Sequence, residues 1–213
     1  KKFIYMPSYN VNIIQKIKSS HIKSFLPNKY IPNKRLYIWT NDWFKQRLPI
    51  KNYNEYNLNY NSVFQIFDRK ISYKNSNEYR IKLEQLKKKN VDTRGHKNIN
   101  ELNSYFINLS KIYNDIKLNG YKSQKKLKSK SIYDEIGVFL GPNGEIIKAE
   151  DKYKGTHRFA ISKILKLKYI YINVRAVDIM FLKNHIFKNI TTRDNEKVVF
   201  EKIKLYLKKY KIK

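Results

Sequence analysis

The chain has 213 residues, with 46 Lys and Arg against 17 Asp and Glu, which gives a formal net charge of +29. It contains no cysteine, which excludes disulfide bonds, thiolate metal sites and a cysteine nucleophile. No apolar run is long enough for a transmembrane helix or a signal-peptide core, so we expect a soluble, cytoplasmic protein. The charge favours a polyanionic partner such as nucleic acid, although the abundance of Lys, Asn, Ile and Tyr is also typical of A- and T-rich codons.

Residues 1–60 are predicted to form an extended N-terminal arm. Prolines interrupt this region at four places: Pro7, Pro27, Pro32 and Pro49. A helix is expected at most around Val11–Lys18, and the polar segment Lys51–Asn61 is expected to be a loop. Both tryptophans, Trp39 and Trp43, lie in this arm. They either anchor it to the main body or face a ligand.

Residues 61–130 are predicted to be helical. Two modest helices are expected between Val63 and Lys89, followed by one long amphipathic helix over about 101–118. Its apolar face is formed by residues at helical spacing: Leu102, Tyr105, Phe106, Leu109, Ile112, Tyr113 and Ile116. Asn98 and Glu101 resemble a capping box at its start. We expect this helix to cover a sheet.

Residues 131–178 contain the predicted core. A β-hairpin is expected over about 136–149, around the turn Gly141–Gly144. A helix over about 157–167 and a strand over about 169–175 follow. The predicted fold class is therefore α+β (mixed α/β), with a small mixed sheet packed against helices.

The turn Gly155-Thr156-His157-Arg158 is the candidate phosphate-binding site, because it lies directly before the predicted helix. A glycine before a helix start lets unpaired backbone amides and the helix dipole hold an anion. The Thr156 hydroxyl and the Arg158 guanidinium are suitable donors to phosphate oxygens. His157 is a further donor, or a proton shuttle near neutral pH.

A structural alternative exists for each of these side chains. Thr156 would then only cap the helix, His157 would pack in the core, and Arg158 would pair with Glu150 or Asp151. The four residues taken alone do not decide between a phosphate site and this structural role.

The segment from Gly141 to Val174, with its Gly-Pro-Asn-Gly-Glu turn and Gly-Thr-His-Arg-Phe-Ala motif, resembles the ParB/sulfiredoxin superfamily. It is most similar to an archaeal and marine-microbial branch that carries Asp-Gly-Arg-His-Arg-Leu-Ala after a Gly-x-x-Gly-Glu hairpin. The likeness extends over roughly Trp39 to Val177 and includes Asp42-Trp43 and Arg94-Gly95. Only the Gly-x-His-Arg region is chemically specific.

The resemblance implies a nucleotide- or phosphate-binding fold. This superfamily hosts CTP-dependent clamping on DNA, ATP-driven sulfinic acid repair, serine phosphorylation and nuclease activity. By position, Gly155–Arg158 would form the phosphate cradle, with a nucleoside di- or triphosphate and Mg²⁺ as ligands. The chain carries Lys154 where the branch has an acid, so Glu150 or Asp151 would supply it as a magnesium ligand or base. Thr156 replaces the sulfiredoxin cysteine, which excludes sulfinic acid repair.

Two basic regions have no assigned chemistry. Residues 179–213 are predicted to form a basic tail with a helix from Asp194, whose apolar stripe comprises Val198, Ile203, Leu205, Leu207 and Tyr210. This helix either packs with a solvated lysine face or rests on a membrane or polyanion. Tyr121–Lys130 is either a solvated connector or a contact to an anionic partner.

Three functions compete on these observations. The first is a nucleotide-dependent phosphotransferase or hydrolase, with Gly155–Arg158 on the phosphates and Glu150, Asp151 or His157 in acid–base or metal-binding roles. The second is a non-catalytic, basic nucleic-acid-binding protein, and the third a basic component of a larger ribonucleoprotein or virion. The histidines outside the turn show no ligand spacing, so no metal site built by the protein is predicted.

Overall fold

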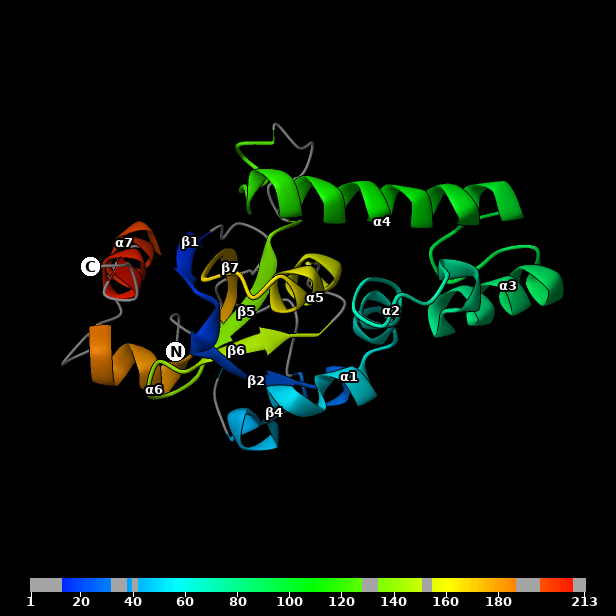
Figure 1. Ribbon diagram of the computed structural model, residues 1–213. Coiled ribbons are helices and arrows are strands. Elements are labelled where there is room, and N and C mark those ends of the chain that lie inside the picture. The colour runs from blue at the N-terminus through cyan, green and yellow to red at the C-terminus, as the bar shows by residue number, and fades with distance from the viewer. Residues whose placement is uncertain are drawn as a thin grey trace. The chain divides into compact units, whose positions relative to one another are not determined.

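The computed structural model describes residues 13–31, 38–39, 42–127, 134–150, 155–186 and 196–208, and it confirms the mixed α/β class (Figure 1). The chain divides into two compact units. The first, here called the sheet unit, comprises Lys1–Tyr53, Lys122–Gly155 and Lys168–Lys213. The second, the helical unit, comprises Asn54–Tyr121 and Thr156–Leu167.

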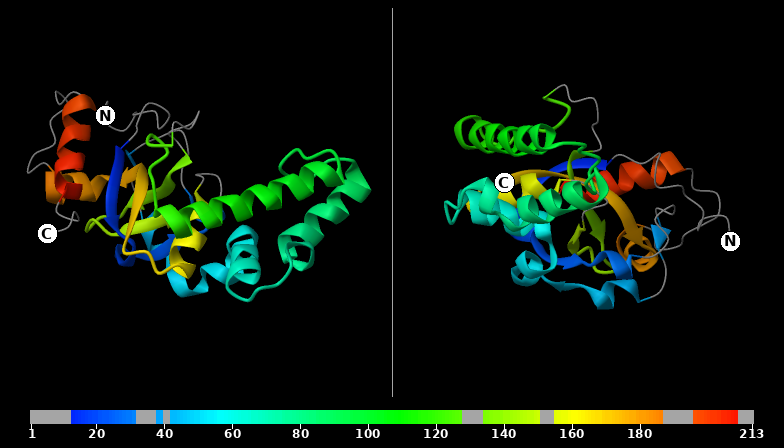
Figure 2. Two further views of the ribbon diagram at one scale, coloured as in Figure 1. Left: turned by 45° about the horizontal axis from the view of Figure 1, so that its top comes forward. Right: turned by 90° about the vertical axis from the view of Figure 1, so that its right-hand side faces the viewer.

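Seven strands form one mixed sheet within the described part of the sheet unit (Figure 2). They are β1 (Ile13–Lys18), β2 (Ile22–Leu26), β3 (Ile38–Trp39), β4 (Leu48–Pro49), β5 (Ile136–Leu140), β6 (Ile146–Ala149) and β7 (Tyr169–Asp178). The strand order is β1-β7-β5-β6-β2-β4, and β3 pairs with β7. Antiparallel pairs are β1–β7, β2–β4 and β5–β6, whereas β5–β7, β2–β6 and β3–β7 are parallel.

The predicted hairpin forms the centre of this sheet. All residues of β5 and β6 are buried, as expected for short apolar strands that are covered on both faces. The Gly141 amide donates to the Glu145 carbonyl at 2.9 Å and closes the turn. Gly144 has a φ of 80°, which favours glycine. The hairpin and the strand after it are thereby confirmed.

The N-terminal region differs from its prediction, because it supplies four strands of the sheet. The segment around Val11–Lys18, where a helix was expected at most, contains β1. Burial alternates along this strand, with Ile13, Gln15 and Ile17 buried, which is the period of two of a strand. Its partner β7 lies more than a hundred residues further along the chain.

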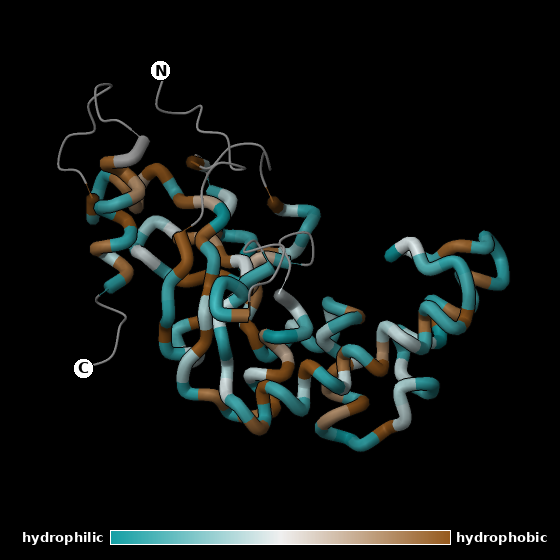
Figure 3. Tube along the Cα trace, turned by 90° about the horizontal axis from the view of Figure 1, so that it is seen from above, coloured by the Kyte–Doolittle hydropathy of each residue, from teal (hydrophilic) through white to brown (hydrophobic). Residues whose placement is uncertain are grey.

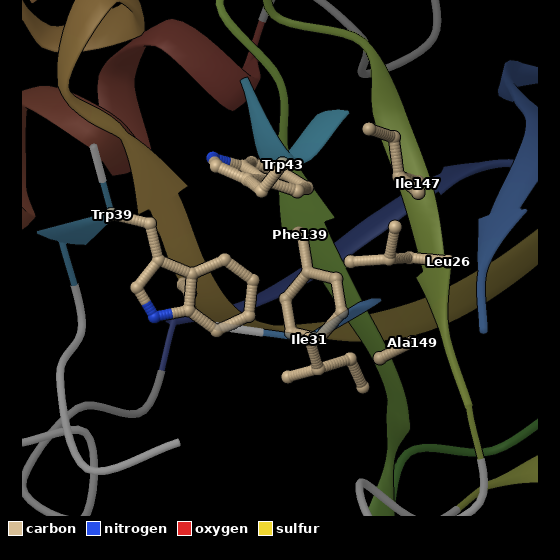
Figure 4. Packing of buried hydrophobic residues seen from close by; sticks show 8 residues of the cluster. Leu26, Ile31, Trp39, Trp43, Phe139, Ile147 and Ala149 are labelled. Atoms are coloured by element: carbon tan, nitrogen blue, oxygen red, sulfur yellow. The ribbon is translucent and has the colours of Figure 1, made fainter. Parts of the chain in front are cut away.

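Trp39 and Trp43 pack in the core of the sheet unit, as the anchoring interpretation predicts (Figure 4). The Trp39 ring lies 4.6 Å from the Phe139 ring and 5.1 Å from the Trp43 ring, centroid to centroid. Both tryptophans are at most 5% exposed. The cluster joins the N-terminal region to β5.

The helical unit contains helices α2 (Leu58–Phe67), α3 (Asn77–Lys89), α4 (Ile99–Asn119) and α5 (Thr156–Ile164), preceded by the short α1 (Tyr53–Tyr56). α1 and the start of α2 replace the predicted loop at Lys51–Asn61. The two helices predicted before Lys89 are confirmed as α2 and α3. Hydrophobic residues recur at short intervals along these helices (Figure 3).

The longest helix, α4, confirms the predicted helix and its cap. The Asn98 side chain accepts a hydrogen bond from the Glu101 amide at 2.9 Å. Its buried face packs against other helices: Tyr113 stacks on Phe67 of α2 at 4.2 Å. The expectation that this helix covers a sheet stays a prediction, since amphipathic spacing specifies a buried face without specifying what covers it.

The described C-terminal elements are α6 (Ile179–Phe181), a π-helical turn (Leu182–Ile186) and α7 (Glu196–Lys208), which packs against β1. α7 buries Val199, Ile203 and Leu207, whereas Val198 and Leu205, predicted for the apolar stripe, are exposed. The predicted helix start at Asp194 and the stripe residue Tyr210 lie outside the described residues. Five short 3₁₀ turns lie within the described ranges: Ser19–His21, Asn28–Tyr30, Trp43–Gln46, Ile50–Asn52 and Tyr73–Asn75. No helix in the described ranges has the length and apolarity needed to cross a membrane.

Candidate functional site

The chain enters α5 through Gly155, and the helix begins at the next residue as predicted. Gly155 has a φ of 78°, and a Cβ atom there would lie 2.6 Å from the Ile136 Cα and 2.8 Å from the Glu135 carbonyl oxygen. Both the backbone conformation and the close approach exclude a side chain. Glycine is therefore required for the turn, whatever ligand the turn binds.

Thr156 is the first residue of α5 and is 5% exposed. Its hydroxyl oxygen is buried and makes no hydrogen bond to any residue in the described ranges. This finding is contrary to the interpretation in which Thr156 only caps the helix, because a capping hydroxyl would accept a backbone hydrogen bond. A buried hydroxyl without a partner costs roughly 1–3 kcal/mol and calls for an explanation.

Arg158 is held by an aromatic ring of its own unit. Its guanidinium carbon lies 4.2 Å from the centre of the Tyr121 ring, and the residue is only 8% exposed. This is the geometry of a cation–π contact. The Tyr121 ring thus covers one face of the guanidinium. The N–H groups of the guanidinium lie in its own plane and point away from its centre.

Of the two predicted acids, the structure describes only Glu150. Glu150 belongs to the sheet unit, where its carboxylate accepts a hydrogen bond from the Asn28 backbone amide. Asp151 lies outside the described residues. The structure thus brings together Thr156, His157 and Arg158, and it gives Glu150 a contact within the sheet unit.

His157 contacts two residues that the sequence interpretation did not select. Its Nε2 atom lies 2.9 Å from the Tyr105 hydroxyl and 3.6 Å from a carboxylate oxygen of Glu78. The Tyr105 hydroxyl in turn donates to the other Glu78 oxygen at 2.8 Å. Helices α3, α4 and α5 thus each contribute one member of a Glu78–Tyr105–His157 chain.

Glu78 is completely buried, at the start of α3. Burial by itself raises the pKa of a carboxyl group, but the hydrogen bond and charge of His157, the charge of Arg94 and the Tyr105 hydroxyl outweigh this effect. The pKa of Glu78 therefore lies below its usual range. Arg94 Nε lies 3.5 Å from the carboxylate. The side chain is a buried carboxylate at neutral pH.

A second buried acid extends this network. Asp92 lies 3.4 Å from the Lys82 ammonium and 2.7 Å from His96 Nδ1, and it also accepts hydrogen bonds from the Arg94 and His96 amides. Burial opposes ionisation of Asp92, but these donors, the His96 side chain first, lower its pKa to about 2. Burial lowers the pKa of Lys82, against the charges of Glu78 and Asp92.

A shallow polar hollow of about 570 Å³ adjoins the network along the N-terminal half of α4. It is lined by His96, Asn98, Asn100, Glu101, Ser104, Tyr105 and Asn108. Among the described residues, no group of three or more His, Asp or Glu side chains is arranged to hold a metal ion. The candidate site thus consists of the Glu78–Tyr105–His157 chain of proton donors and acceptors and the start of α5.

Sequence reasoning missed Glu78 and Tyr105, and little in the sequence marks them. Glu78 has the position of an ordinary acid in the first turn of a helix, and Tyr105 fits the apolar stripe of α4. They lie 79 and 52 residues before His157 in the chain. Only tertiary packing of α3, α4 and α5 brings the three together.

Comparison with known proteins identifies no relative. No family model matches the chain, and neither a curated protein nor a solved structure matches it significantly. The resemblance to the ParB/sulfiredoxin superfamily stays a prediction, and the site is interpreted from its own geometry.

Proposed function

We propose that the start of α5 binds the phosphate group of a nucleotide or phosphorylated small molecule, and that the protein is a ParB-like phosphotransferase or nucleotide hydrolase. The observation that carries this proposal is the buried Thr156 hydroxyl, which has no hydrogen-bond partner in the described ranges. A phosphate oxygen would provide that partner. The same ligand would accept hydrogen bonds from the first amides of the helix.

The surrounding groups suit an anion. The N-terminus of a nine-residue helix carries a partial positive charge, and Arg158 adds a full one two residues later. The guanidinium is planar by itself and suits two-pronged bonding to phosphate oxygens, and the Tyr121 ring on one face restricts its orientation. Phosphoryl transfer depends mainly on such positioning and charge stabilisation.

In this proposal, Mg²⁺ binds together with the phosphate-bearing ligand. The described residues offer no cluster of carboxylates for the ion, so its main ligands would be the phosphate oxygens themselves and water. His157, which lies between Thr156 and Arg158, is the acid–base group in this proposal. The sequence-based assignment of Glu150 or Asp151 as a magnesium ligand or base stays a prediction; the Glu150 carboxylate accepts a hydrogen bond from the Asn28 amide.

A thermal-shift screen of nucleoside di- and triphosphates, with and without Mg²⁺, tests the proposal. A ligand that binds only the folded state must raise the melting temperature, by an amount equivalent to about 2.7 kcal/mol at a hundred times its Kd. Isothermal titration should then show that Arg158→Ala weakens binding by about 1.5–3 kcal/mol, the range for a hydrogen bond to a charged group. Arg80→Ala, an exposed arginine of the same unit, is the matched control and should bind normally.

Two results would refute the phosphate site. The first is the absence of stabilisation by every nucleotide and by inorganic phosphate. The second is a loss of melting temperature in Arg158→Ala that matches its loss of binding, which would identify Arg158 as a structural residue.

Nucleic acid is the second candidate partner, because the net charge is +29 and the exposed Lys87, Lys88 and Lys89 end helix α3. Binding of this kind is strongly salt-dependent and produces no turnover. Titration of a DNA duplex and a single strand at several salt concentrations distinguishes it from nucleotide binding. The phosphate site predicts saturable nucleotide binding that Arg158→Ala weakens, whereas a lysine surface predicts DNA binding that this variant leaves unchanged.

A further inference from the structure

The Glu78–Tyr105–His157 chain fixes where its protons lie. Glu78 is a buried carboxylate and can only accept hydrogen bonds. Tyr105 has one hydroxyl proton, which it gives to Glu78 at 2.8 Å. The contact of 2.9 Å between the Tyr105 oxygen and His157 Nε2 must therefore use a proton on Nε2. In the neutral ring, Nδ1 is then the unprotonated nitrogen.

Nδ1 is the ring nitrogen that these contacts leave for a ligand. No residue in the described ranges hydrogen-bonds to it, and the side chain is 18% exposed. The ring is held in place at its other nitrogen, so the lone pair on Nδ1 has a defined direction. It belongs to the residue between Thr156 and Arg158, the two side chains of the proposed phosphate site.

We infer that His157 acts through Nδ1 as the general base that activates a hydroxyl group, of an alcohol or of water, for attack on the bound phosphoryl group. Tyr105 and Glu78 are positioning residues, because they act on the substrate only through His157. The inference rests on the proposed function and adds to it the class of acceptor and the atom that takes the proton.

Transfer of the phosphoryl group to the acceptor breaks two bonds and forms two. The acceptor O–H bond breaks and its proton moves to Nδ1, while a new bond forms between the acceptor oxygen and phosphorus. The bond from phosphorus to the leaving oxygen breaks, and that oxygen departs with the electron pair. The resulting imidazolium keeps its Nε2–H bond to Tyr105, with the Glu78 carboxylate oxygen 3.6 Å away to balance the charge. Solvent later removes the proton.

The first arm of the test needs no ligand. Nitrogen-15 NMR of the full chain with labelled histidine, of which there are four, reports the tautomer of each ring, and His157→Gln assigns the signal. With the ring neutral, we expect His157 to be protonated at Nε2. Tyr105→Phe removes the acceptor of that proton and should shift the ring toward a mixture of tautomers. A ring protonated at Nδ1, or one that Tyr105→Phe leaves unchanged, overturns the inference.

Tyr79→Phe is the matched control for this variant. Tyr79 also gives its hydroxyl proton to a side chain of α4, Asn103, at 3.0 Å, but it makes no contact with His157. Its removal should leave the His157 signal as in the wild type. If both variants shift the signal equally, the ring senses general loosening of the helices, and the inference fails.

The second arm measures turnover with ATP and Mg²⁺ as the probe, with water as the acceptor. His157→Gln should lower kcat about a hundredfold or more, as expected for loss of a general base. Tyr105→Phe should lower kcat at least about tenfold, because a misdirected tautomer has impaired catalysis in comparable sites. In both variants KM should change less than twofold. Unchanged kcat in Tyr105→Phe overturns the positioning role.

The two arms separate failure of the inference from failure of the proposed function. If no phosphate ligand binds while the tautomer is as expected, the phosphate site and the acceptor assignment both fall. If nucleotide binds and Arg158→Ala weakens it, but the tautomer or the kcat pattern is wrong, the phosphate site stands and the base assignment falls.

Discussion

The two units treat their buried charges differently. In the sheet unit, buried charged groups hold nearby or neighbouring backbone: Asp178 accepts from the Met180 amide, Glu135 from the Gln124 amide, and Lys148 donates to the Ala149 carbonyl. In the helical unit, the Glu78 carboxylate contacts the side chains of Tyr105, Arg94 and His157, and Asp92 contacts the side chains of Lys82 and His96 in addition to two backbone amides. Charges bonded to backbone fix the path of the chain, whereas charges bonded to each other can exchange protons and respond to a ligand.

The helical network also joins segments that are distant in the sequence. Glu78 from α3, Tyr105 from α4 and His157 from α5 meet at one point, and Asp92 and Arg94 contribute from the loop between α3 and α4. A stable helical unit could be built with apolar residues at these positions, and would avoid the cost of burying ions. Because so many ionisable groups are buried together here, we propose that function lies in this network and that the apolar core of the sheet unit provides stability.

The largest effect on stability is expected in that apolar core. Phe139 is fully buried and packs against Trp39 and Trp43, so Phe139→Ala removes a large side chain that its neighbours cannot replace. The free energy of unfolding should fall by about 4 kcal/mol, measured by urea denaturation. ATP affinity of the folded variant should stay as in the wild type. A matching loss of affinity would show that the division of roles between the units is wrong.

A somewhat smaller loss is expected from the buried ionic network. Asp92→Asn removes the ion-pair partner of the buried Lys82 ammonium and leaves only the charge of Glu78 nearby, so it should lower the free energy of unfolding by about 3 kcal/mol. Asp42→Asn is the control, because Asp42 pairs with Lys45 on the surface and should contribute less than about 1 kcal/mol. Equal effects of the two variants would mean that burial of the Asp92 pair has no energetic consequence.

The pH dependence of stability should differ in sign between the units. The folded-state pKa values of Glu78 and Asp92 are lowered, so their stabilisation is complete above their ordinary values of 4.5 and 3.8. It is lost as the pH falls through the lowered values, which for Asp92 is about 2. Burial raises the pKa of Asp178, so the charged form of that group costs stability above its ordinary value of 3.8.

Calorimetric melting between pH 5 and pH 2 tests this sign. The wild type should lose stability over that interval, and the double variant Glu78→Gln/Asp92→Asn should lose less of it. Asp178→Asn should leave the acid-induced loss in place. If the double variant follows the wild-type curve, other carboxyl groups control acid unfolding.

Local patterns predicted the elements whose stabilising contacts are local. α4 has a full helical period and a capping box, and the hairpin at 136–149 has its own turn, so neither depends on distant residues for recognition. β1 was missed because Ile13, Ile14 and Ile17 fit both a helical and a strand spacing. Its pairing with β7 decides between them, and that pairing is not visible in the local sequence.

The candidate site shows the same limit of local patterns. Sequence reasoning selected Thr156, His157 and Arg158 because a glycine before a helix start is a local feature with a known chemical consequence. Glu78 and Tyr105 could not be found, because the acid resembles a dipole-stabilising residue and the tyrosine resembles a core residue. What the sequence could not supply is the packing of three helices that turns these ordinary residues into partners of His157.

The smallest predicted effect concerns the second tyrosine beside α5. The Tyr121 ring supports the Arg158 guanidinium at 4.2 Å, so Tyr121→Leu should weaken nucleotide binding by about 0.5–1 kcal/mol, the value of a partly exposed cation–π contact. Tyr121→Phe keeps the ring and should bind as the wild type in isothermal titration. If Tyr121→Leu also binds normally, the ring only fills space.

The two tyrosines beside α5, Tyr105 and Tyr121, are expected to have different roles. Tyr105 is inferred to act through its hydroxyl group and Tyr121 through the face of its ring. The same chemical change, removal of a phenolic hydroxyl, should therefore impair turnover at Tyr105 and have no effect at Tyr121. A loss of similar size in both phenylalanine variants would indicate that each hydroxyl merely stabilises the helical unit, and the distinction between positioning a base and holding a cation would fail.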